Sequence, residues 1–258
     1  MERKNHSGGR ENTMRIDDRE IELDAHSHTI ASGHAYGTIR EMAREAGEKG
    51  LKLLGICEHT PDIPGACDAI YFHNLEVVPR TLYGVDILLG AELNILKGGR
   101  FPLEERELAM LDYRCAGVHG LCYELGTKAE NTRDVLSALE SPWLDILVHP
   151  DERAVELDYG QLVPAAAEHH VLLELNNSSL GHKVKGARCV ENYLEMLELC
   201  KRYRAPVIFG SDAHDPSGVK SFQRLYDLFL QVEFPRELIM NLDKSAFLAF
   251  LERKHAGL

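Results

Sequence analysis

The chain is organised around the stretch Leu23-Asp24-Ala25-His26-Ser27-His28-Thr29, with Ser32-Gly33-His34 close behind it. Residues 20–24 have the character of a strand, and two histidines follow at its end. Because side chains two residues apart in a strand point to the same side, His26 and His28 can direct both imidazoles at one metal ion. An isolated pair of this kind is more often a pair of surface histidines, so its interpretation depends on what the later strands provide.

The length and composition indicate a globular chain that is poorly suited to binding nucleic acid. Its 258 residues make one large domain or two small ones, with 44% hydrophobic and 27% charged residues. The formal net charge of -12 argues against a broad basic face for nucleic acid. An anionic substrate stays compatible with this charge if bound metal changes the local field. No apolar run approaches the roughly 18 residues that span a membrane.

The cysteines and the first residues bear on location and domain limits. None of the six cysteines forms a C-x-x-C pair, which argues against a zinc knuckle or a thioredoxin-type site. Reduced thiols in a chain without a signal segment predict a cytoplasmic protein. Residues 1–19 are polar, and we expect a flexible tail there, followed by a single domain over residues 20–258. A homo-oligomer is compatible with the sequence.

Strand-like and helix-like segments alternate along the chain. Strands are predicted at residues 20–24, 51–57, 85–93, 113–118, 144–148, 171–175 and 206–209. Helices are predicted after the capping box of Thr38 and Glu41, at residues 131–139, 161–169, 190–203 and 221–232, and at 245–253 with Asp243 as N-cap. This alternation predicts an α/β fold with a parallel sheet, whose seven strands could close a barrel or stay open. The irregular segment 61–80 is long enough to suggest a functional loop.

Nearly every predicted strand ends on a histidine or an acidic residue. Seven of the 13 histidines stand there beside two carboxylates, and the nine residues are His26, His28, His34, His59, Glu92, His119, His149, Asp212 and His214. Active sites of parallel α/β folds lie at the carboxyl ends of the strands, so the sequence predicts a multinuclear metal site. Imidazole and carboxylate ligands favour zinc, manganese or iron over calcium. The set suffices for two ions, and for three if a carboxylate bridges.

Several local motifs follow one another in a fixed order: Asp24-Ala25-His26-Ser27-His28-Thr29, Ala31-Ser32-Gly33-His34-Ala35-Tyr36, Gly55-Ile56-Cys57-Glu58-His59, Gly90-Ala91-Glu92-Leu93-Asn94-Ile95, Val148-His149-Pro150, Glu174-Leu175-Asn176-Asn177-Ser178-Ser179 and Gly210-Ser211-Asp212-Ala213-His214. In these motifs the sequence resembles the PHP (polymerase and histidinol phosphatase) family of metal-dependent phosphoesterases, over residues 21–250. The resemblance is closest to the stand-alone bacterial phosphatases of the YcdX type. It implies a distorted seven-stranded (β/α) barrel with three divalent metal ions, zinc in the first place and manganese or iron as alternatives.

The resemblance also implies how the ligands are divided. One ion would be held by His26, His28, Glu92 and Asp212, a second by Glu92, His119 and His149, and the third by His34, His59 and His214. Glu58 stands where the family commonly has an aspartate, and the loop residues Tyr71-Phe72-His73 depart from the expected pattern. A longer carboxylate beside the ligands would change orientation and rate more than metal loading. The departure in the loop leaves the substrate preference open.

The implied activity is hydrolysis of small phosphate monoesters by a metal-activated hydroxide, which needs no nucleophilic side chain. The residues expected to be catalytic are His26, His28, Glu92, His149 and Asp212. Three divalent ions and two carboxylates would leave a charge of about +4, which attracts phosphate. The candidate substrate contacts are Arg80, Lys128, Lys183, Asn176, Asn177 and Ser178. Glu174 is expected to be a satisfied interior group, Asp24 to orient a ligand, and Tyr36 to line the pocket.

Four alternatives stay open. An amidohydrolase-type enzyme also begins with His-x-His, but it usually needs an eighth strand and often a bridging lysine on strand four, which residues 113–118 lack. A PHP-type nuclease acting on DNA ends would fit the ligands but not the charge. Histidinol phosphate is a possible substrate. A non-enzymatic metal-binding regulatory protein would usually have lost ligands, and none is missing here.

Overall fold

The structure is a computed structural model that describes residues 16–151, 155–181, 188–256 and 258. Most of the predicted tail, residues 1–19, lies outside this range. Its last residues belong to the folded part, because Ile16 is buried in the hydrophobic core and Asp17 caps a short 3-10 helix, η1 (Asp18–Glu20). This helix takes up only the first residue of the strand predicted at 20–24, of which Leu23 and Asp24 form a strand.

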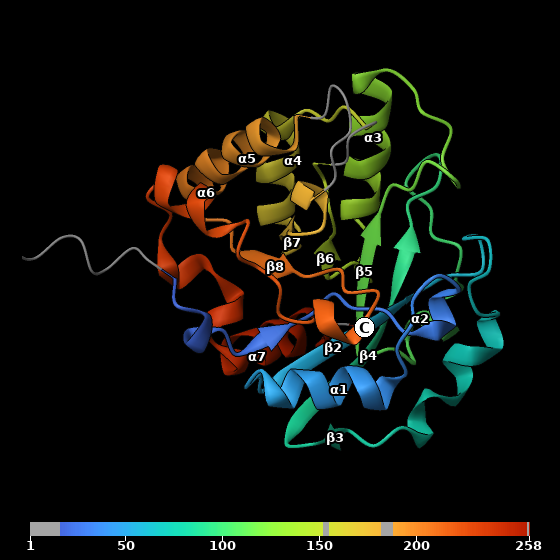
Figure 1. Cartoon of the computed structure of the whole chain (residues 1–258). Helices are drawn as coiled ribbons and strands as arrows, with labels where there is room; N and C mark the ends of the chain where they lie inside the picture. Colours follow the sequence, from blue (N-terminus) through green and yellow to red (C-terminus); the bar gives the residue numbers. More distant parts are fainter. Residues whose placement is uncertain (1–15, 152–154, 182–187, 257) are drawn as a thin grey trace, which may run out of the picture.

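Seven parallel strands form a nearly closed barrel, as predicted (Figure 1). They lie in the order β1 (Leu23–Asp24), β2 (Leu53–His59), β4 (Val85–Asn94), β5 (Tyr113–Gly117), β6 (Ile146–Leu147), β7 (Leu172–Asn176) and β8 (Val207–Gly210). A short strand that the sequence did not predict, β3 (Thr81–Leu82), runs antiparallel to β4. The loops after β1 and β8 close the ring, because Ser27 bridges to Ala213 and Asp212 donates its N–H to the His26 carbonyl oxygen at 2.9 Å.

The α-helices lie mostly on the outside of the barrel (Figure 1). They are α1 (Ile39–Glu48), α2 (Glu105–Leu108), α3 (Lys128–Leu139), α4 (Tyr159–Glu168), α5 (Cys189–Tyr203), α6 (Tyr226–Gln231) and α7 (Lys244–His255). The predicted capping box of Thr38 and Glu41 opens α1, and the Asp243 carboxylate caps α7. The helix predicted at 221–232 is wrong in its first part, because α6 begins only at Tyr226. The segment 61–80 contains a nine-residue 3-10 helix, η3 (Ala69–Val77).

Two hydrophobic layers fix the barrel. The outward side chains of the strands pack against the surrounding helices, while the inward ones, such as Leu23, Leu53 and Tyr113, form a separate cluster inside the barrel. Phe247 and Leu251 of α7 join this inner cluster. Because these strand residues are the first of β1, β2 and β5, α7 plugs the amino end of the barrel. The carboxyl end stays available for polar side chains. No helix in the described ranges is long and apolar enough to cross a membrane.

Candidate metal centre

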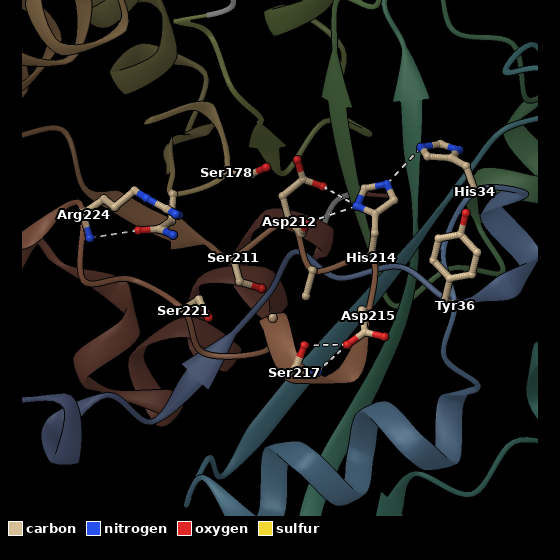
Figure 2. Close-up of a pocket in the computed structure, with 13 residues that line it drawn as sticks. His34, Tyr36, Ser178, Ser211, Asp212, His214, Asp215, Ser217, Ser221 and Arg224 are labelled. Atoms are coloured by element: carbon tan, nitrogen blue, oxygen red, sulfur yellow. Dashed lines mark hydrogen bonds and ion pairs between the residues drawn. The ribbon is translucent and has the colours of Figure 1, made fainter. Parts of the chain in front are cut away.

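The structure brings all nine predicted ligands to the carboxyl end of the barrel. His26 and His28 lie just beyond β1, not within it, and His34 follows a 3-10 helix, η2 (Ile30–Ser32). The others stand at or just after strand ends: His59 on β2, Glu92 on β4, His119 after β5, His149 after β6, and Asp212 and His214 after β8. Figure 2 shows three of the nine, His34, Asp212 and His214, close to one another beside a pocket. Residues far apart in the sequence therefore share one site because parallel strands end at the same face.

The first group of donors has the spacing of a tetrahedral metal site. The Nε2 atoms of His26 and His28 lie 3.1 Å apart. The His26 Nε2 atom is 3.6 Å from Glu92 Oε2 and 3.5 Å from Asp212 Oδ1, and the His28 Nε2 atom is 3.3 Å from each of these oxygens. Zinc bonds of about 2.0–2.1 Å in a tetrahedron place the ligand atoms about 3.3 Å apart. These four side chains fit the set predicted for one ion.

The second group is built on the other oxygen of Glu92. Its Oε1 atom lies 2.7 Å from His149 Nε2 and 3.0 Å from His119 Nε2. The two oxygens of this buried carboxylate thus face different imidazoles, which is the arrangement that a bridging ligand requires.

Two of the candidate ligands, His149 and Asp212, have positive φ angles of 32° and 52°. Strained backbone of this kind costs about 1–3 kcal/mol and is characteristic of functional sites.

The third group is less separate than the sequence predicted. The Nε2 atoms of His34 and His214 face each other at 3.0 Å. His59 stacks on His34 with ring centroids 5.0 Å apart, but its Nδ1 atom lies 3.0 Å from Glu92 Oε2. His59 therefore stands between the groups, and its ring can join either His28 and His214 or Glu92 and His119.

Cys57 is a further candidate ligand that the sequence treatment missed. Its Sγ atom lies within reach of the His26 and His28 nitrogens, although no C-x-x-C pair marks it in the sequence. The side chain points into the barrel two residues before His59 on the same strand. That spacing was the only sequence signal that could have placed it there.

The outer nitrogens of four imidazoles are held so that the inner nitrogens face the cluster. His34 Nδ1 lies 3.1 Å from the Ser32 carbonyl oxygen, and His214 Nδ1 lies 3.0 Å from the Asp212 carbonyl oxygen. A carbonyl oxygen only accepts, so in the neutral form of each ring the Nδ1 atom carries the proton and the Nε2 atom carries a lone pair. Two lone pairs that face each other at 3.0 Å repel unless a cation lies between them. The donor set therefore fits a metal ion.

Glu174 holds His26 in the same way. Its Oε1 atom accepts from His26 Nδ1 at 2.6 Å, and its Oε2 atom accepts the His149 N–H at 2.7 Å. The interpretation of Glu174 as a satisfied interior group was incomplete, because it positions two of the ligands. Gly210 makes room for it, since a Cβ atom there would lie 1.7 Å from Glu174 Oε1. Carboxylates behind a ligating histidine orient the ring and raise its basicity.

Ser32 connects His28 to Glu58. The Ser32 hydroxyl donates to Glu58 Oε2 at 2.6 Å and accepts the His59 N–H at 3.0 Å. Its single proton is thereby used, so the 3.0 Å contact with His28 Nδ1 requires the imidazole to donate. Glu58 thus acts on His28 through a hydroxyl, with its other oxygen bound by the Thr29 hydroxyl at 2.5 Å. Glu58, which is one methylene longer than the aspartate common in the family, therefore contacts His28 only through Ser32.

Asp24 acts on the main chain instead of on an imidazole. Its carboxylate accepts the N–H groups of His26 and Ser211 at 3.3 Å and that of Lys220 at 3.0 Å. It thereby ties the loop after β1 to the loop after β8. Asp24 orients His26 as predicted, but by fixing the backbone on which that ligand stands.

The electrostatics of the cluster favour ionised carboxylates and a bound cation. Burial alone would raise the pKa of Glu92. The adjacent His59, His119 and His26 have the larger effect and bring this pKa well below its usual range. Burial lowers the pKa of His59 and of His214 to about 4 each, so both rings are neutral at pH 7. Burial also opposes protonation of His28, but the carboxylates of Asp212 and Glu92, each with an oxygen 3.3 Å from its Nε2 atom, raise its pKa to about 10.

Buried atoms without partners mark the middle of the cluster. Glu92 Oε2 and His59 Nδ1 are buried, and neither has a hydrogen-bond partner among the residues that the structure describes. Leaving a buried polar atom unsatisfied costs about 1–3 kcal/mol, more for a charged group. A cation between the two atoms would satisfy both.

The predicted substrate contacts divide into two sets. Arg80 lies at the wrong end of the barrel, where it pairs with Asp112 at 2.5 Å beside the starts of β4 and β5. Lys128 is an exposed residue of the first turn of α3, near the Asp158 charge. Lys183 lies outside the described residues. The structure therefore does not bring Arg80 to the site, because the loop that carries it precedes its strand.

Asn176, the last residue of β7, and the next two residues, Asn177 and Ser178, do reach the site. The Asn176 Nδ2 atom lies 3.4 Å from Asp212 Oδ2 and 3.3 Å from Glu174 Oε2. Asn177 and Ser178 line a pocket of about 620 Å³ that also contains His34, Tyr36, Asp212 and His214 (Figure 2). Arg224 lines the same pocket, and the sequence treatment missed it because no motif surrounds it.

Comparison with known proteins places this site in a family. No family model matches the chain. A "Probable phosphatase" of Caldicellulosiruptor bescii is 39% identical over 233 residues, which cover 90% of this chain and 96% of the relative. A second, from Caldicellulosiruptor saccharolyticus, is 40% identical over 232 residues with the same coverage. The crystal structure of histidinol phosphate phosphatase from Lactococcus lactis, complexed with zinc, L-histidinol and phosphate, shares the fold with a TM-score of 0.52 at 17% identity, over 83% of this chain and 94% of that one. With its relatives matched over nearly their full length, the chain belongs to the PHP phosphatase family.

Proposed function

We propose that the protein is a metal-dependent phosphoesterase that hydrolyses small phosphate monoesters at a site for three divalent ions. The observation that carries this proposal is the position of Glu92, whose two buried oxygens face separate groups of histidines. The relatives named as phosphatases support the reaction class. Zinc is the first candidate because the Lactococcus enzyme binds it and because imidazole and carboxylate ligands suit it, with manganese and iron as alternatives.

The residues of the site have three roles: they would hold the metal ions, orient the imidazole ligands and attract the phosphate group. Divalent ions in this site would supply a hydroxide at neutral pH by lowering the pKa of water. Glu92 and Asp212 provide two negative charges for about six positive ones, so a net charge of about +4 would draw the phosphate group in. Glu174 and Ser32 keep the Nε2 atoms of His26 and His28 turned inward. Asn176 contacts Asp212 Oδ2, which leaves Oδ1 for the cluster.

The finer assignments stay predictions. They comprise the YcdX-type subgroup, the cytoplasmic location, a homo-oligomeric state and the natural substrate. Histidinol phosphate stays a candidate substrate because the Lactococcus enzyme is named for it. An amidohydrolase is disfavoured, because the barrel has seven parallel strands and β5 carries no lysine.

Phosphate release tests the proposal. The zinc-loaded protein and its Asp212→Asn variant are assayed with p-nitrophenyl phosphate, histidinol phosphate and a single-stranded DNA oligonucleotide. We expect phosphate release from the monoesters by the unchanged protein, a loss of at least a hundredfold in the variant, and intact DNA. Cleavage of DNA without phosphate release would favour the nuclease, and an inert protein that binds zinc would favour the regulatory alternative.

A further inference from the structure

We propose that Arg224 selects phosphate esters whose leaving group carries a second anionic group, a carboxylate or another phosphate. This inference rests on the proposed function. The pocket of about 620 Å³ runs from the ligands His34, Asp212 and His214 to Arg224, on the loop before α6 (Figure 2). One molecule in this pocket can place its phosphoryl group on the cluster and its far end on the guanidinium.

Arg224 is held at the rim by the strands that build the site. The main-chain N–H of Arg224 donates to Asn177 Oδ1 at 3.1 Å. The buried Asn177 in turn donates its main-chain N–H to the Gly210 carbonyl oxygen, at the end of β8, at 2.9 Å. The guanidinium lies against Gly181, where a Cβ atom would be 3.2–3.4 Å from its carbon and terminal nitrogens. These contacts fix the base of the side chain and support its planar end.

The charges around the pocket leave Arg224 available for an anion. Arg224 forms no ion pair with any residue in the described part of the chain, and its side chain is exposed. The other charged groups of the pocket are otherwise engaged: Asp212 faces His26 and His28, and Asp215 accepts from the Ser217 N–H and hydroxyl. Figure 2 shows Asp215 turned toward Ser217, with Arg224 on the opposite side of Asp212.

The chemistry of this pocket defines the substrate class. A guanidinium binds carboxylate or phosphate through two parallel hydrogen bonds, which gives both charge and geometric selection. Ser178 and Ser221 add hydroxyl groups to the walls, which suits a hydroxylated carbon chain between the two anionic ends. A cationic leaving group such as histidinol would meet a like charge at Arg224. The pocket therefore favours an acidic phosphate ester over histidinol phosphate.

Matched substrate pairs test this selection. The first pair is 3-phosphoglycerate and glycerol 3-phosphate, which differ by a carboxylate, and the second is fructose 1,6-bisphosphate and fructose 6-phosphate, which differ by a phosphate. We expect kcat/KM to be higher for the more anionic member of at least one pair. In Arg224→Gln this preference should fall at least tenfold, mainly through KM, and Arg224→Lys should restore part of it. The pair that responds identifies the anionic group.

Two further variants separate selection from general damage. Gly181→Ala displaces the guanidinium without removing it and should also reduce the preference. Arg202→Gln, on the exposed side of α5, should leave both the preference and the rate unchanged. The role of Arg224 would be overturned if the unchanged protein had equal kcat/KM values for the two members of each pair. It would also be overturned if Arg224→Gln lowered kcat/KM equally for both members, and neither result would affect the proposed function. Failure to release phosphate from any ester, including p-nitrophenyl phosphate, would instead overturn the proposed function.

Discussion

At the scale of single residues, the contacts behind the ligands decide how the site works. The imidazoles of His26, His28, His34 and His214 each have an oxygen at Nδ1, and each turns Nε2 toward the cluster. The nine candidate ligands could be named from the sequence because each lies at or beyond the carboxyl end of a predicted strand. The supporting contacts of Ser32, Glu58 and Glu174 could not, because they depend on which side chains the closed barrel places next to one another.

The carboxylate of Glu174 gives a prediction at this scale. Glu174→Gln keeps a hydrogen-bond acceptor for His26 but removes the charge that raises the basicity of the ring. Loss of a contact of this kind typically weakens metal affinity about 10–100-fold. Competition titration with a zinc chelator measures the effect, with exposed Glu195→Gln as the control. Equal zinc affinity in the two variants would show that Glu174 only fills space.

The protonation of His28 predicts how metal binding depends on pH. In the metal-free protein the pKa of His28 is raised to about 10, so the ring holds its proton at pH 7.5. Burial opposes protonation of His26, but Glu174 raises its pKa well above the usual value, so a second proton is present. Binding of zinc must displace these protons, and lowering the pH therefore weakens the affinity about tenfold per pH unit for each proton released.

Titration with zinc in weak buffers containing a pH indicator measures this release. We expect between one and two protons per chain at pH 7.5, and a zinc Kd at pH 6.5 at least tenfold above that at pH 7.5. His59 and His214 should contribute none, because their pKa values of about 4 leave them neutral. A Kd that does not change between these pH values would contradict the electrostatic account of the cluster.

At the scale of elements, side chains that alternate along each strand separate the residues of the outer core from the residues that face the barrel interior and the site. Along β2, Leu54 and Ile56 face the outer core, whereas Leu53 and Cys57 face the barrel interior, in line with the final ligand His59. The apolar alternation made the strands predictable. The limits of the strands were less predictable: β1 and β6 each have two residues where five were predicted, and most of the missing residues are at the amino ends of these strands.

Helix α7 should matter for stability and not for catalysis. Its Phe247 is fully buried against the first residues of the strands, at the end of the barrel opposite the ligands. Phe247→Ala should lower the free energy of unfolding by about 3–5 kcal/mol, because it leaves a cavity in the inner core. Urea denaturation checks this, and phosphate release at low temperature should stay within about threefold of the unchanged protein. A large loss of activity without a loss of stability would contradict the separation of the two ends.

At the scale of the whole molecule, the barrel turns a set of distant motifs into one site in an acidic protein. The order and number of the parallel strands were predictable, because each strand carried a recognisable end. The placement of the loop cations was not. Arg80 lies in a loop before its strand and therefore at the amino end, whereas Arg224 reaches the pocket only because β7 and β8 are neighbours. The sequence alone does not show which loops meet.

The metal content of the purified protein tests the central claim most directly. The protein is loaded with zinc, freed of excess metal, and analysed for zinc per chain by mass spectrometry beside Glu92→Gln and the control Glu195→Gln. We predict three ions in the unchanged protein and in the control. Glu92→Gln should hold one, at His34, His59 and His214, because both other ions share the carboxylate of Glu92. A single ion or none in the unchanged protein, or three ions in Glu92→Gln, would contradict the account.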